Sequence, residues 1–125
     1  MQGTLVTGGL CARGDQQILG VSFQESDLYA PILKLTEARL LLALAGANGA
    51  KVVKTDTKQA YLYGDMEDDV VNVRPLDWWP EPVQEGHVFL LLKSINGTLQ
   101  AASKWNMHIS TWMEKNGYLA VNSDP

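Results

Sequence analysis

The sequence is short of the residues on which several common kinds of site depend. It has one cysteine, Cys11, and two histidines, His87 and His108, among 125 residues. A single thiol excludes an intramolecular disulfide and fits a reducing compartment. Two distant histidines without a cysteine cluster give no zinc pattern. We therefore expect an intracellular protein, cytoplasmic or nuclear, whose stability rests on neither disulfides nor zinc.

Long hydrophobic runs are also lacking. The apolar run 40–45 follows Arg39 and ends at Gly46, far short of the roughly 20 residues that a membrane-spanning helix needs. We expect this run to form a helix of the core. The first nine residues have neither the basic start nor the continuous apolar stretch of a secretory signal. The sequence thus predicts that the protein is not secreted and has no membrane partner.

Positive charge is scarce as well. Ten Lys and Arg stand against 14 Asp and Glu, for a formal net charge of −4. Such a chain has no general attraction for a polyanion, so binding to nucleic acid requires a local basic strip or a further segment. With 46% hydrophobic residues the chain is long enough to bury one core. We expect one globular domain.

Two amphipathic helices are the clearest elements of the sequence. The first is expected to begin at Thr36 as N-cap, with Glu37 at the positive end of the helix dipole, and to stop at the Asn-Gly pair 48–49. The second is expected between residues 100 and 116, where apolar side chains recur at spacings of three and four. The Asn-Gly pair 116–117 marks its end.

Short apolar and β-branched runs predict strands. They lie at residues 51–55, 70–73 and 88–92, with a further short strand at 118–121. The acidic loop before 70–73 suggests that this run forms a hairpin with 51–55. The proline-rich stretch 78–82 interrupts regular structure. The fold class that follows is α+β, one unit in which a small, mainly antiparallel sheet lies against two helices.

Asp56 follows directly on the strand predicted at 51–55. A strand fixes the direction of the backbone, so a carboxylate at its end can hold a divalent cation where a phosphate group reacts. By itself, however, such an aspartate more often caps a turn. Tyr61 alone is more often a half-buried core ring than a nucleotide gate, and Gln100 more often a surface residue at a helix N-terminus. The acidic run 65–69 lacks EF-hand spacing, which favours a solvated hairpin tip over a calcium loop.

Five separate blocks of the sequence occur in a characteristic order and spacing. They are residues 12–17, 29–36, 39–45, 54–65 and 105–125. Together they resemble the reverse transcriptase of copia-type retrotransposons, over a span from roughly residue 10 to the end. The resemblance implies a right-hand polymerase in which residues 1–125 form one domain segment that supplies part of the fingers and palm.

The resemblance also implies roles for individual residues. Asp56 matches the first catalytic aspartate, and the carbonyl of Thr57 would help to hold the same Mg²⁺ or Mn²⁺ in a two-metal nucleotidyl transfer. Tyr61 matches the ring that rejects ribonucleotides through their 2′-hydroxyl. Gln100 matches a glutamine beside the incoming nucleotide, and Arg13 would contact its triphosphate. The implied partners are an RNA or DNA template-primer, a deoxynucleoside triphosphate and the remainder of a polyprotein.

Two departures from the family pattern bear on activity. Ala102 and Ser103 stand where the family has Pro-Arg, which removes a cation suited to phosphate. The family's Tyr-x-Asp-Asp hairpin comes downstream of the match at 123–125. We therefore expect the metal to be needed only in the complete enzyme, and the chain alone to bind Mg²⁺ weakly and not to polymerise DNA. Two alternatives stay open, a non-enzymatic remnant of such an element and a recruited binding module derived from it.

Overall fold

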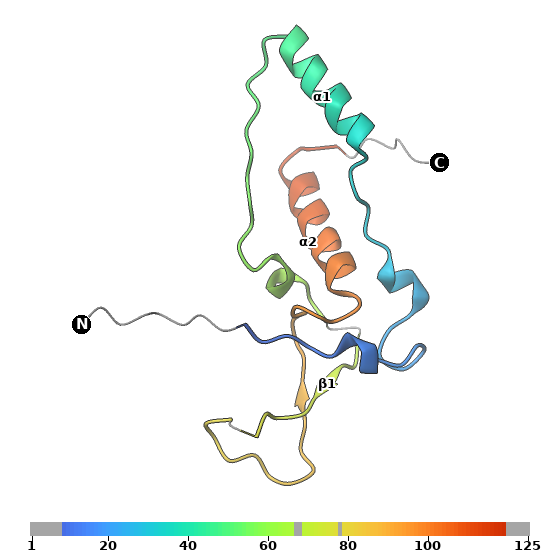
Figure 1. The fold of residues 1–125 in the computed structure, drawn as a ribbon, viewed down its shortest axis with the longest axis vertical. Coiled ribbons are helices and arrows are strands. Elements are labelled where there is room, and N and C mark those ends of the chain that lie inside the picture. The colour runs from blue at the N-terminus through green and yellow to red at the C-terminus, as the bar shows by residue number, and fades with distance from the viewer. Residues whose placement is uncertain (1–8, 67–68, 78, 120–125) are drawn as a thin grey trace, which may run out of the picture.

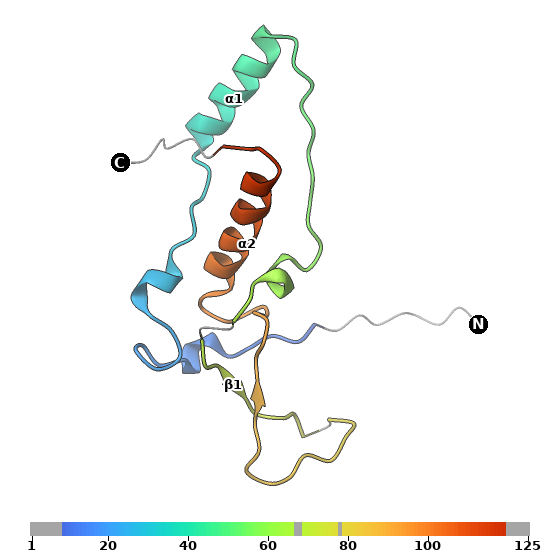
Figure 2. The same cartoon turned by 180° about the vertical axis from the view of Figure 1, so that it is seen from behind.

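The computed structural model describes residues 9–66, 69–77 and 79–119. The helices and strands of these residues are, in chain order, η1 (Gly14–Gln16), η2 (Glu25–Leu28), α1 (Leu35–Ala47), η3 (Ala60–Tyr63), β1 (Asn72–Val73), β2 (Phe89–Leu90) and α2 (Ala101–Lys115), where η marks a 3-10 helix. Two α-helices and a two-stranded antiparallel sheet confirm the α+β class. Figures 1 and 2 show an elongated arrangement, with α2 between α1 at one end and the strands at the other.

Both predicted α-helices are confirmed, with one change at the start of α1. The backbone N–H of Lys34 donates to Glu37 Oε2 at 3.1 Å, which makes Lys34 the N-cap and places Thr36 inside the helix. Both helices end at their Asn-Gly pairs. Asn48 and Asn116 each donate a side-chain N–H to the carbonyl four residues earlier, at 2.8 Å. The asparagine side chains thus satisfy a free carbonyl at each C-terminus.

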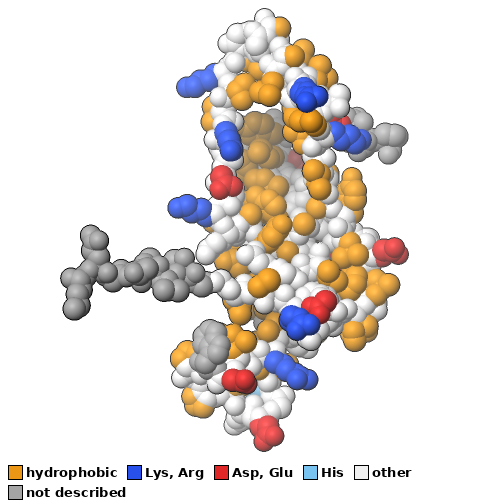
Figure 3. All heavy atoms as spheres, viewed as in Figure 1, with side chains coloured by type: hydrophobic (Ala, Val, Ile, Leu, Met, Phe, Trp, Pro, Cys, Tyr) orange, Lys and Arg blue, Asp and Glu red, His pale blue; other side chains and the backbone are white. Residues whose placement is uncertain are grey.

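Helix α1 does not bury its leucines. Leu40, Leu41 and Leu44 are 59%, 58% and 50% exposed, and no other helix or strand of the described residues packs against α1. Figure 3 shows apolar side chains on the surface of this end of the molecule. The prediction of a core helix is therefore wrong, because an apolar helix is buried only where another element covers it. Within the described ranges, no helix has the length and apolar character needed to cross a bilayer.

The strand predicted at 51–55 is absent. Residues 50–57 form an exposed, irregular segment that connects α1 with η3 along one side of the molecule (Figure 1). A strand needs a partner edge, and β1 pairs with β2 instead. The predicted hairpin of 51–55 with 70–73 is therefore wrong. The observed register places Asn72 opposite Leu90 and Val73 opposite Phe89.

The sheet and the helices do not pack on each other as predicted. Among the described elements, α2 contacts η2 and η3, whereas β1 contacts only β2. Phe89 of β2 instead contacts Trp79, and the centroids of the two rings lie 5.0 Å apart. The neighbouring Trp78 lies outside the described residues. Of the strand predicted at 118–121, positions 118 and 119 are irregular and the other two are not described.

The core is small and partly polar, and it lies at the N-terminal end of α2. Its buried side chains are Met66, Val71, Ser94, Thr98, Gln100 and Ala101. An ion pair continues this core along α2. Lys104 Nζ lies 2.9 Å from Asp69 Oδ2, with both side chains only 11% exposed. These contacts, rather than the sheet, fix the position of α2.

Candidate functional site

The segment that carries Arg13 interlocks with the turn before α2. The N–H of Ala12 donates to Asn96 O at 2.7 Å. A Cβ at Gly14 would lie 2.2 Å from Gly97 O, and a Cβ at Gly97 would lie 2.2 Å from Ala12 O. Gly97 also has φ +90°, which strains any residue with a side chain. Both glycines are therefore required for the two backbones to approach so closely.

Arg13 itself is exposed and already paired. Its Nε and Nη2 donate to the two carboxylate oxygens of Asp15 at 2.9 and 2.6 Å. These hydrogen bonds lower the pKa of the Asp15 carboxyl and raise the pKa of the Arg13 guanidinium. A triphosphate would have to replace Asp15 as the partner of this fork, which suits carboxylate and phosphate equally.

Gln100 is completely buried at the N-terminus of α2, so its reading as a surface residue is wrong. Its Oε1 accepts from Gln17 Nε2 at 2.9 Å, and its Nε2 donates to Ser22 O at 3.0 Å. Gln17 Oε1 in turn accepts from the N–H of Leu99 at 2.8 Å. Gln17 and Gln100 are 83 positions apart in the sequence. No local pattern around either residue indicates that they meet.

Tyr61 lies on η3, which packs against α2. The completely buried Ser94 holds this turn at two points. Its hydroxyl donates to Tyr61 O, and its N–H donates to Gly64 O at 2.9 Å. A Cβ at Gly64 would lie 2.7 Å from Lys104 Cβ, so glycine lets the turn lie directly on the helix. Tyr61 is intermediate in burial, neither fully covered nor fully exposed.

Asp56 and Thr57 are exposed in the irregular segment before η3. The Asp56 carboxylate forms no hydrogen bond or ion pair with any described residue. Its carboxylate and the Thr57 carbonyl are hard oxygen donors of the kind that Mg²⁺ prefers. Nowhere in the described ranges, the surroundings of Asp56 included, do three His, Cys, Asp or Glu side chains gather into a metal-binding group. These two residues fit part of a Mg²⁺ coordination shell and leave the rest to other ligands.

Lysines flank Asp56 on both sides. Lys51, Lys54 and Lys58 are all exposed, and none has an ion-pair partner among the residues that the structure describes. Figure 3 shows basic side chains along the left edge of the view, which the segment between α1 and η3 forms. Residues 51–58, called the lysine strip below, thus form a locally basic, exposed region on a chain of net charge −4.

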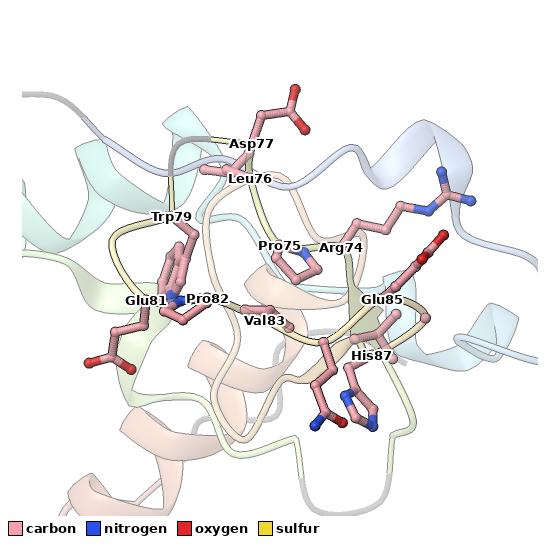
Figure 4. Close-up of a pocket in the computed structure, with 13 residues that line it drawn as sticks. Arg74, Pro75, Leu76, Asp77, Trp79, Glu81, Pro82, Val83, Glu85 and His87 are labelled. Carbon is pink, nitrogen blue, oxygen red and sulfur yellow. The ribbon is translucent and has the colours of Figure 1, made fainter.

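Two cavities lie beside the strands, and Asp56 lines neither. The first, of about 730 Å³, is enclosed by the connection from β1 to β2, with Trp79 and His87 on its wall (Figure 4). The second, of about 820 Å³, lies between the strands and the N-terminal segment and is bordered by Arg13 and Gln17. Of the site residues predicted from sequence, Arg13 borders the second of these two cavities.

The structure brings some of the predicted site residues together. Arg13, Tyr61 and Gln100 lie on segments that meet around the N-terminal end of α2 through the contacts described above. Asp56 and Thr57 stand apart from these contacts, next to η3 in the sequence. The supporting roles of Gln17 and Ser94 were missed. Gln17 belongs to the block 12–17 that carries the family resemblance, but nothing near it indicates its contact with Gln100, and nothing near Ser94 distinguishes it from an ordinary polar loop residue.

Comparison with known proteins gives one consistent family. Residues 6–123 match a family model described as reverse transcriptase (RNA-dependent DNA polymerase). The chain is 32% identical over 117 residues to the retrovirus-related Pol polyprotein from transposon TNT 1-94 of Nicotiana tabacum, and 27% identical over 115 residues to that from transposon RE2 of Arabidopsis thaliana. These alignments cover 93% and 92% of this chain but only 8% of each relative. No solved structure matches the chain.

Proposed function

Because the chain belongs to the reverse transcriptase (RNA-dependent DNA polymerase) family, in its copia-type retrotransposon branch, we propose that it contributes to the polymerase site of a Pol polyprotein. In this proposal the chain supplies part of the fingers and palm. Its substrates are a template-primer and a deoxynucleoside triphosphate, and the reaction is RNA-directed DNA synthesis. The match over 93% of the chain supports this assignment.

The observation that carries the proposal is the lysine strip around Asp56. A single carboxylate among three exposed lysines combines a ligand for a cation with a surface for phosphates. Each lysine that contacts a phosphate on binding contributes about 0.7 to 0.9 to the slope of log affinity against log salt. The strip therefore accounts for nucleic-acid binding by a chain whose net charge is −4.

The family implies a divalent cation, Mg²⁺ or Mn²⁺, which Asp56 and the Thr57 carbonyl would hold. A bound cation supplies charge neutralisation at the reacting phosphoryl group. On segments that stand apart from Asp56 in this structure, Arg13 would exchange Asp15 for the triphosphate, and the partly exposed Tyr61 would lie against the sugar. The family resemblance assigns Gln100 a place beside the nucleotide, and its completely buried carboxamide would have to leave Gln17 and Ser22 to contact it.

A paramagnetic titration tests the metal-binding part of the proposal. We expect Mn²⁺ to broaden the NMR signals of Asp56 and Thr57 before those of other residues, since broadening falls steeply with distance from the ion. Asp56→Asn removes the charged ligand and should abolish this selective effect. Asp77→Asn changes an equally exposed aspartate in the β1–β2 connection and serves as the matched control. Equal broadening in wild type and Asp56→Asn would contradict the assignment.

Nucleic-acid binding and synthesis test the remainder. The affinity for a template-primer is expected to fall with salt, and the slope should decrease by about 2 to 3 when Lys51, Lys54 and Lys58 are all changed to glutamine. Primer extension is expected only when the chain is part of a longer Pol polyprotein, where Asp56→Asn should abolish it and Asp77→Asn should not. Asp56-dependent extension by the 125-residue chain alone would show that the expected requirement for further residues is wrong.

A further inference from the structure

We propose that the second cavity binds a nucleotide, with the base against the Trp79 ring and a phosphate at Arg74. This cavity lies between the strands and the N-terminal segment, and its volume of about 820 Å³ is within the range typical of small-molecule sites. Asp56, Tyr61 and Gln100 do not line it. The inference therefore goes beyond the proposed function, which places a nucleotide with those residues, and does not depend on it.

The charge of the second cavity favours an anionic ligand. Of the described residues that line it, two are arginines, Arg13 and Arg74, and none is acidic. The first cavity shares Arg74 but has three acidic residues on its wall, which disfavour an anion, namely Asp77, Glu81 and Glu85. Asp15 already pairs with Arg13, whereas Arg74 is exposed and forms no hydrogen bond or ion pair with any described residue. The Arg74 guanidinium is therefore free to donate two parallel hydrogen bonds to a phosphate.

An aromatic wall gives the same cavity a surface for a flat ring. Trp79 and Phe89 both line it, with their ring centroids 5.0 Å apart. Trp79 keeps 39% of its surface exposed, so its contact with Phe89 does not cover it. Figure 4 shows Trp79 and Arg74 at opposite ends of the short segment 74–79. Because every nucleobase has a π-face that stacks on aromatic side chains, a base and its phosphate match the two kinds of group that this cavity offers.

Titration of the chain with deoxyadenosine 5′-monophosphate (dAMP) in the absence of metal, followed by NMR, tests this site. We expect the Trp79 indole N–H and the Phe89 ring signals to shift. Deoxyadenosine and ribose 5-phosphate each lack one half of the ligand and should bind roughly tenfold more weakly. Arg74→Gln removes the free cation and should weaken dAMP binding by about tenfold. Arg39→Gln, which changes an exposed arginine of α1, is the matched control.

Two further comparisons define the base and the source of the nucleotide. Trp79→Leu keeps an apolar side chain but removes the stacking ring, so it should weaken dAMP binding by about tenfold. Trp112→Leu changes a tryptophan of α2 that is 51% exposed and is its control. A four-residue oligodeoxyadenylate that shifts the same signals at lower concentration than dAMP would assign the cavity to a unit of a single strand. Weaker binding of the oligonucleotide than of dAMP would assign it to a free nucleotide, and either result supports the site.

The absence of shifts at Trp79 and Phe89 on addition of dAMP would overturn the inference. So would an Arg74→Gln variant that binds dAMP as tightly as Arg39→Gln, and this comparison decides the matter even if Trp79→Leu does not fold. Asp56→Asn should leave dAMP binding unchanged, and its loss in that variant would place the nucleotide at the lysine strip instead of the cavity. Unselective broadening by Mn²⁺ together with intact dAMP binding would contradict the proposed metal site alone.

Discussion

Gly97→Ala is expected to separate the N-terminal segment from the turn before α2. The new Cβ would lie 2.2 Å from Ala12 O and 2.6 Å from Cys11 Sγ, and both belong to the segment that carries Arg13. No real Cβ tolerates such an approach to a backbone oxygen, so the two segments must move apart. The hydrogen bond from Ala12 N–H to Asn96 O, now 2.7 Å long, is lost as they do so.

The magnitude follows from two separate costs. A left-handed conformation such as φ +90° costs a residue with a Cβ about 1–2 kcal/mol. Loss of the Ala12 hydrogen bond adds about 1 kcal/mol. The sum of about 2–3 kcal/mol is the expected decrease in the free energy of unfolding, and the lost hydrogen bond is part of it because the clash forces the two segments apart.

Two matched variants separate these costs. Gly86 has φ +83° with no atom within 4 Å of its ideal Cβ, so Gly86→Ala introduces the backbone strain alone. Gly14 has an ordinary φ, but its Cβ would lie 2.2 Å from Gly97 O, so Gly14→Ala introduces the close contact alone. We therefore expect Gly14→Ala to separate the segments and Gly86→Ala to leave them docked.

Hydrogen exchange at single residues measures the outcome directly, because each amide reports its own local opening. The amide of Ala12 should lose its protection in Gly97→Ala and Gly14→Ala and keep it in Gly86→Ala. The amide of Leu99, which donates to Gln17, should follow the same pattern. Retained protection of Ala12 in Gly97→Ala would refute the interlock between the two segments.

Three further predictions concern the surroundings of the site. Lys93→Met should raise the pKa of Asp65 toward its usual value of about 3.9 in an NMR titration, because the hydrogen bond from Lys93 is the main cause of the lowered pKa. The Lys93–Asp65 pair stabilises the fold above about pH 4, and this stabilisation is lost as the pH falls through the lowered pKa of Asp65. An unchanged pKa in Lys93→Met would exclude this ion pair. Ser94→Ala should loosen η3 by about 1 kcal/mol, seen as faster amide exchange around Tyr61, and unaltered exchange would show that the hydroxyl does not hold the turn. We expect the exposed leucines of α1 to make copies of the chain associate as its concentration rises. Leu41→Glu, at a position 58% exposed, should reduce this association in sedimentation with little loss of helix, and association equal to that of the wild type would show that α1 does not mediate it.

The two α-helices could be predicted because their signals are local. Apolar spacing and the Asn-Gly pairs at 48–49 and 116–117 lie within each helix and its flanks. Both helices have their C-terminal ends where these pairs predicted them. The strands at 70–73 and 88–92 were also recognised, although only two residues of each run form a strand. The run 51–55 has the same β-branched character but no strand beside it. A propensity for extended backbone yields a strand only where a partner edge is available.

The site was predicted unevenly for a related reason. Family resemblance drew attention to Asp56, Tyr61 and Gln100, and chemistry alone explained why oxygen ligands suit a divalent cation. Neither the resemblance nor the chemistry indicated that Gln100 is buried, or that Gln17 and Ser94 support the elements that carry site residues. Those contacts join residues from distant parts of the sequence, and a polar side chain in a loop looks the same before and after such a contact forms.

The sequence alone determined the family, the α+β class, the helices and the types of side chain available for binding a cation and phosphates, because these depend on residue identity and near neighbours. The tertiary structure decided which surfaces are covered. It left α1 exposed, placed Asp56 on an open segment, and buried Gln100 in hydrogen bonds with Gln17 and Ser22. Burial and hydrogen-bond direction depend on which segments meet in space, and that is a property of the folded chain as a whole.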